Sequence, residues 1–123
     1  MKVIKMLFWV GGLYDFILGV AFLALPTVLF DKFSITPPNH WGYVTFAAAM
    51  LTIFGIMFFQ IAKDPKANRN LIPYGILLKI AYCGTVFGFY FFASLPMLWV
   101  VFGIFDFLFL LVFVWAYQKL AKI

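Results

Sequence analysis

The sequence has few of the residues that build most metal and redox sites. It contains one cysteine, Cys83, and one histidine, His40. A single cysteine excludes an internal disulfide, a CxxC redox pair and a thiolate-rich metal cluster. A single histidine leaves no second imidazole for a haem or metal pair across a helical bundle, so we assign no metal ligand. We interpret Cys83 as a small core residue and His40 as a solvated loop residue.

Motifs of soluble enzymes and of nucleic-acid-binding proteins are also missing. The sequence has no glycine-rich phosphate-binding loop, no serine, histidine and aspartate set for nucleophilic catalysis, and no surface suited to reading bases. We therefore assign no catalytic residue, favour a role other than that of an enzyme, and expect no nucleic-acid partner.

Charged residues are scarce. They make up 11% of the 123 residues, whereas hydrophobic residues make up 67% and aromatic residues 23%. A soluble domain needs more polar surface than this to cover itself, so we predict an integral membrane protein surrounded by a lipid bilayer. The chain is long enough for four membrane-crossing helices of about 20 residues each and little else. We expect one domain, residues 1–123.

Four apolar runs place these helices at about 6–26, 41–61, 71–92 and 96–117. We expect a proline-broken loop at 27–40, between the first two runs, because turn-forming and polar residues gather there. The connections are short, so adjacent helices should be antiparallel. The predicted fold is all-α, an up-down-up-down bundle of four transmembrane helices.

Basic residues predict the orientation of this bundle. Of the nine Lys and Arg residues, all but Lys32 and Lys79 lie near the two termini or in the loop between the second and third helices. Positive charge favours the cytoplasmic side of a membrane. We expect both termini and that loop in the cytoplasm of a cell with a bacterial-type inner membrane. The net charge of +5 thus reflects topology.

Three ionisable residues lie inside the apolar runs: Asp15, Lys79 and Asp106. Counting about 1.5 Å per residue from the helix ends places all three about 12 to 15 Å deep, near the bilayer midplane. A lone charge there costs about 2.5 to 3.5 kcal/mol. We therefore predict that Lys79 pairs with at least one carboxylate, and that the surplus carboxyl group takes up a proton or meets a cation.

The two aspartates occur in similar sequences. Gly12-Leu13-Tyr14-Asp15-Phe16 resembles Gly103-Ile104-Phe105-Asp106-Phe107, and a Trp-Val pair precedes each. We interpret this as an internal pseudo-repeat that relates the first and fourth helices. Thr52 reaches the same depth, and Tyr82 shares a helix face with Lys79. The predicted ligand-binding or proton-binding residues are Asp15, Lys79, Asp106, Thr52 and Tyr82.

Two roles remain open for Asp15, Lys79 and Asp106, here called the polar layer. Buried charges can specify which helices meet without any further function. Ionisable residues within membranes more often mark a ligand or proton site, and we favour that role. The many aromatic residues are interpreted as core and lipid-facing residues, with an aromatic cavity for a flat apolar ligand as the alternative.

A second pattern concerns helix contacts. Gly84-Thr85-Val86-Phe87-Gly88 matches the GxxxG pattern of closely packed membrane helices. Gly84 is five residues beyond Lys79 and therefore points away from the charged face. Packing within the chain and contact with another subunit, including a second copy of the chain, both remain open.

The four-helix layout and the stretch Gly11-Gly12-Leu13-Tyr14-Asp15-Phe16-Ile17-Leu18-Gly19-Val20-Ala21-Phe22-Leu23-Ala24-Leu25-Pro26 resemble the DoxX-like group of bacterial membrane proteins. The resemblance implies a bundle associated with quinone-linked oxidoreductase systems, as a partner or membrane subunit, with a quinone or a lipid as the bound molecule. No catalytic residue is carried over from it.

These observations together predict a small integral membrane protein that binds an apolar or amphipathic ligand, or a partner membrane protein, through the polar layer. Two other functions remain open. One is a small proton-coupled transporter, and the other is a structural subunit of a larger membrane complex.

Overall fold

The computed structural model describes residues 1–122, which form five α-helices and one short 3-10 helix without any β-strand. Four of the helices are long and apolar enough to cross a membrane, so the predicted all-α fold with four helices able to span a membrane is confirmed. The elements in chain order are α1 (Lys2–Ala24), α2 (Pro26–Lys32), α3 (Gly42–Lys63), η1 (Arg69–Leu71), α4 (Ile72–Phe92) and α5 (Met97–Ala121).

The helix ends differ from the expected ones at two places. α1 begins at Lys2 rather than near residue 6, and α5 continues to Ala121 rather than to residue 117. Basic residues lie in both extensions, at Lys2, Lys5 and Lys119. Their long stems can lie along apolar surface while the charge stays in water, so an apolar pattern alone underestimates such helices.

The predicted loop at 27–40 is wrong in its first half, because Pro26–Lys32 forms α2. Pro26 lies at the first helical position, where the missing amide proton costs little. Phe30 is buried and its ring lies 5.0 Å from that of Trp41. Ser34 adopts a φ of 55°, and the amide of Ile35 donates to the carbonyl of Phe30, which ends the helix in a Schellman motif.

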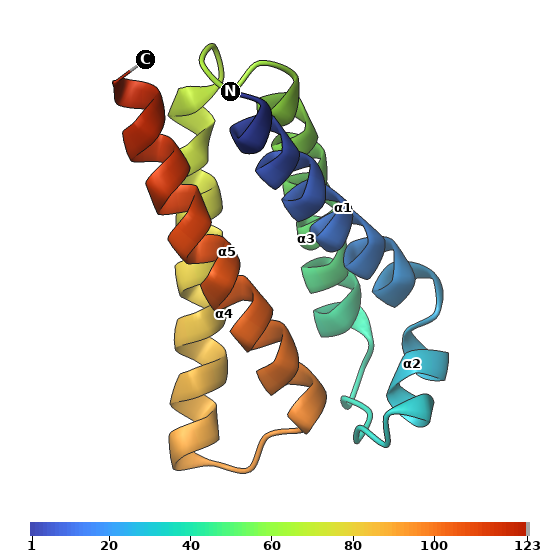
Figure 1. Cartoon of the computed structure of the whole chain (residues 1–123). Coiled ribbons are helices and arrows are strands. Elements are labelled where there is room, and N and C mark those ends of the chain that lie inside the picture. The colour runs from blue at the N-terminus through green and yellow to red at the C-terminus, as the bar shows by residue number, and fades with distance from the viewer. Residues whose placement is uncertain (123) are drawn as a thin grey trace.

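The long helices form two antiparallel pairs, α1 with α3 and α4 with α5 (Figure 1). Figure 1 shows the start of α1, the end of α5 and the loop between α3 and α4 at one end of the bundle, here called the termini end. α2 and the connection between α4 and α5 lie at the other end, the α2 end.

Glycine permits the close approach of α1 to α3. A Cβ atom built on Gly19 would lie 2.6 Å from the Thr52 amide nitrogen and 2.8 Å from the Ala48 carbonyl oxygen. A Cβ on Gly55 would lie 2.7 Å from the Phe16 amide nitrogen. Small residues are typical of such helix contacts in membranes, where lipid is as apolar as the side chains and van der Waals packing drives association.

The two glycines of the GxxxG pattern on α4 make no such close contact among residues 1–122. A Cβ atom on Gly84 or on Gly88 would meet nothing within 4 Å. Neither glycine therefore serves a close helix contact within residues 1–122, and the alternative of packing within the chain is not supported.

Two apolar clusters fill the bundle. The larger one, at the termini end, joins all four long helices. Within it the rings of Phe8 and Phe113 stack at 4.7 Å and Phe58 lies against both, with all three side chains fully buried. The smaller cluster, at the α2 end, contains Phe22 and Phe30. The three buried ionisable residues, Asp15, Lys79 and Asp106, lie between these two clusters.

Candidate ligand-binding site

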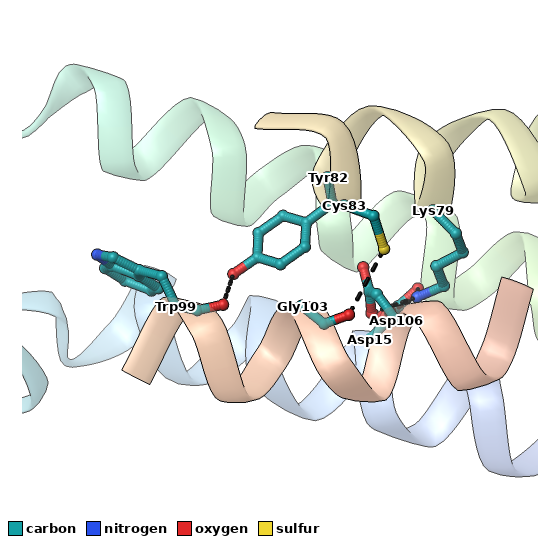
Figure 2. A network of polar contacts seen from close by, with 7 residues as sticks. All are labelled: Asp15, Lys79, Tyr82, Cys83, Trp99, Gly103 and Asp106. Atoms are coloured by element: carbon teal, nitrogen blue, oxygen red, sulfur yellow. Dashed lines mark hydrogen bonds and ion pairs between the residues drawn. The ribbon is translucent and has the colours of Figure 1, made fainter. Parts of the chain in front are cut away.

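Lys79 joins the two buried carboxylates. Its Nζ lies 2.9 Å from Oδ1 and 2.9 Å from Oδ2 of Asp15, and 3.1 Å from Oδ1 of Asp106. Figure 2 shows the three side chains converging from α1, α4 and α5. Lys79 and Asp15 have no exposed surface, and 5% of Asp106 is exposed. The predicted pairing is confirmed, and the two repeated sequences supply the two carboxylates.

One turn before Lys79 and Asp106 of this ion triad, glycines leave space for apolar side chains of neighbouring helices. Phe58 occupies the space beside Gly75, which precedes Lys79 by four residues, and Val86 lies against Gly103, which precedes Asp106 by three. The Nζ of Lys79 is 5.3 Å from the ring of Phe109 and 5.6 Å from those of Phe58 and Tyr14. Aromatic faces attract a cation at such distances and thus help to hold the buried ammonium group.

The two carboxylates differ in how many of their oxygen atoms accept a hydrogen bond from Lys79. Both oxygens of Asp15 accept from Lys79, whereas Asp106 accepts through Oδ1 alone. Within residues 1–122, Oδ2 of Asp106 accepts no hydrogen bond. Because 7% of the Asp106 side chain is exposed and the residue lines a cleft, this oxygen is the one available to a further partner.

That cleft lies between the two helix pairs, on the α2 side of the ion triad. Its volume is about 560 Å³, and it runs from Tyr43 and Phe30 to Asp15 and Asp106. Its walls are apolar for most of this length. The charged residues that line it are Asp15 and Asp106, which together form its floor.

One side of the cleft is closed by aromatic rings from α1 and α5. The ring of Phe22 lies 5.6 Å from that of Trp99 and 6.4 Å from that of Phe102, and the ring of Tyr14 also lies 6.4 Å from that of Phe102. On the other side, between α3 and α4, the lining residues Tyr43, Phe46, Ala47, Ala81 and Thr85 are exposed. The cleft therefore opens between α3 and α4.

Tyr82 and Thr52 complete the account of the predicted residues. The hydroxyl of Tyr82 donates to the carbonyl oxygen of Trp99 at 3.1 Å and the residue lines the cleft (Figure 2). The hydroxyl of Thr52 donates within its own helix to Ala48 at 2.8 Å, and the residue packs against Gly19. The structure therefore does not bring Thr52 to the ion triad or to the cleft wall.

Tyr14 was not among the predicted residues. It lines the cleft beside Asp15, and its buried hydroxyl has no hydrogen-bond partner within residues 1–122. A buried hydroxyl without a partner costs free energy, which a ligand could offset. The signal for it was present in the sequence, since the pseudo-repeat places tyrosine before Asp15 and phenylalanine before Asp106.

Cys83 and His40 agree with their sequence interpretation. Cys83 is buried, and its Sγ lies 3.5 Å from the Gly103 carbonyl oxygen. His40 is exposed in the loop before α3, where its Nδ1 accepts from the Gly42 amide.

Comparisons of this chain with protein-family models, with curated proteins and with solved structures find no match. The resemblance to the DoxX-like group therefore stays a prediction.

Proposed function

We propose that this protein binds one amphipathic, lipid-soluble molecule in the cleft, with the polar end of that molecule at Asp106. The observation that carries the proposal is an apolar cleft of about 560 Å³ that ends at a carboxylate oxygen to which no group among residues 1–122 donates. The ligand's apolar part would lie between the two helix pairs.

The cleft has the size and lining of a ligand site. Ligand pockets in proteins commonly measure about 300 to 1,000 Å³ and combine apolar walls with a few convergent polar groups. From Trp99 to Asp106 the wall follows seven residues of α5, a rise of about 10 Å. That length suits a chain or ring system of lipid dimensions.

The route into the cleft favours a ligand that arrives from the membrane. The exposed lining residues lie between α3 and α4, on a surface that lipid would surround. At the termini end, the fully buried rings of Phe8, Phe58 and Phe113 block any continuation of the cleft. The arrangement supports binding from one side and argues against a continuous pore.

The cleft also bears on the other candidate functions. A triad that only held helices together would be packed on all sides, whereas 7% of the Asp106 side chain stays exposed and the residue lines the cleft. A proton-coupled transporter would pass through this one-sided form as one of two states. If the termini are cytoplasmic, as the charge pattern suggests, the cleft opens in the outer half of the membrane.

Binding of tritiated decanol to the protein in phosphatidylcholine nanodiscs tests the proposal. We expect saturable binding, near one molecule per chain, above the background of empty nanodiscs. Ala81→Trp should abolish it, because the indole would fill the opening of the cleft. Leu77→Trp is the matched control, since Leu77 is an exposed residue of the same helix outside the cleft lining. Equal binding by both variants would refute the proposal.

A further inference from the structure

We infer that the cleft selects a molecule whose polar end is a cationic amine, so that the ligand class is a lipid-soluble ammonium ion. This inference rests on the proposed function and adds the chemistry of the ligand's polar end. It follows from a count of hydrogen-bond donors, acceptors and charges at the floor of the cleft.

Among residues 1–122, the floor of the cleft has no cationic donor left for an anionic ligand. An ammonium group has three N–H donors. Those of Lys79 point to three oxygens, Oδ1 and Oδ2 of Asp15 and Oδ1 of Asp106. Lys79 is fully buried and does not line the cleft. A carboxylate or phosphate end would therefore meet an acidic floor whose cation is already bound.

Most of the polar atoms that remain available in the cleft are hydrogen-bond acceptors. Oδ2 of Asp106 has no donor within residues 1–122, and the Tyr82 hydroxyl already donates its hydrogen bond to the carbonyl oxygen of Trp99, so both oxygens present lone pairs. Tyr14 contributes a hydroxyl that can donate or accept. A ligand with several N–H donors satisfies this set better than a ligand with acceptors alone.

The net charge of the site also favours a cationic ligand. Two carboxylates and one ammonium group carry a formal charge of −1, and no cationic side chain lines the cleft among residues 1–122. An uncompensated buried charge is costly in a membrane, and a bound cation would cancel it.

The walls also suit a cation. Trp99 and Phe102 line the cleft on α5, Tyr14 lines it next to Asp15, and Tyr82 lines it from α4. Aromatic faces attract ammonium groups, most strongly where water is excluded. The same chain already holds the ammonium group of Lys79 among three rings, at 5.3 to 5.6 Å.

Three probes with one alkyl chain test this inference: decylamine, decanol and decanoate, each measured at neutral pH in phosphatidylcholine nanodiscs. We expect decylamine to bind at least about tenfold more tightly than decanol, and decanoate to show no saturable binding. Asp106→Asn should remove this preference, lowering decylamine affinity about tenfold while decanol binding changes less than about twofold.

Two further variants distinguish an effect of the Asp106 charge from a loss of the folded structure. Asp106→Glu keeps the negative charge and should restore most of the preference for decylamine. Asp64→Asn removes a carboxylate from the loop after α3, outside the cleft lining, and should leave all three affinities unchanged.

The outcomes separate the two proposals. If decanol binds saturably and decylamine binds no better, the cationic selectivity is refuted and the proposed function stands. Tighter binding of decanoate would refute the selectivity in the same way. If none of the three probes binds saturably, both proposals fail.

Discussion

Replacing Lys79 by methionine removes the cation that joins the two buried carboxylates and keeps most of the volume of the side chain. Lys79 has no exposed surface and donates at 2.9, 2.9 and 3.1 Å. Removing one partner of a buried ion pair typically costs about 3 to 5 kcal/mol, because the other partner is left uncompensated. Lys79→Met leaves two carboxylates uncompensated, so we expect a loss of about 5 kcal/mol in the free energy of unfolding.

A triple variant separates the cost of the orphaned charges from a packing defect. Lys79→Met combined with Asp15→Asn and Asp106→Asn has no charge in the layer and similar volumes at all three positions. Neutral replacements of a whole buried ion cluster are often harmless to stability. We therefore expect the triple variant to be more stable than Lys79→Met alone, by at least about 2 kcal/mol.

The free energy of unfolding can be measured by titrating sodium dodecyl sulfate into mixed micelles and following circular dichroism. Lys63→Met serves as the control, because Lys63 is exposed at the end of α3 and should change stability by less than about 0.5 kcal/mol. A loss below about 1 kcal/mol for Lys79→Met would refute the reasoning, since it would mean that the carboxylates need no buried cation.

Two further predictions concern helix packing and topology. Gly19→Ala should destabilise the protein by about 1 to 3 kcal/mol, because its Cβ would press on the α3 backbone. Gly84→Ala, where a Cβ meets open space, should be neutral or slightly stabilising in the same unfolding assay, and equal losses at both sites would contradict this packing. Cysteines introduced near Asn39 and near Asn68 should react with an impermeant maleimide from opposite sides of the membrane. Labelling of both from the same side would contradict the predicted orientation.

The sequence by itself determined the class of the protein and the depth of its charges. Four apolar runs of sufficient length predict four membrane-crossing helices, because each backbone polar group in lipid must be satisfied within its own segment. Counting residues along those helices places Asp15, Lys79 and Asp106 at one level, and the cost of a lone charge in lipid requires that they meet. The structure agrees, with Lys79 bound to both carboxylates.

Helix periodicity does not say which helices are neighbours. In a membrane, lipid and side chains are equally apolar, so the contacts depend on detailed shape rather than on hydrophobicity. The pairing of α1 with α3 therefore depends on Gly19 and Gly55, whose partners lie far away in the chain. The same reason explains why Thr52 does not reach the ion triad. It lies at the predicted depth, but it faces the contact with α1.

Tertiary structure alone decided the cleft and the inequality of the two aspartates. The two repeated sequences assign Asp15 and Asp106 the same surroundings, yet Lys79 takes both oxygens of Asp15 and one of Asp106. α2 was missed for a similar reason, because the burial of Phe30 depends on Phe22 and Trp41 rather than on its own neighbours in sequence. An open space between helix pairs depends on how all four long helices tilt and pack, and that property belongs to no single segment.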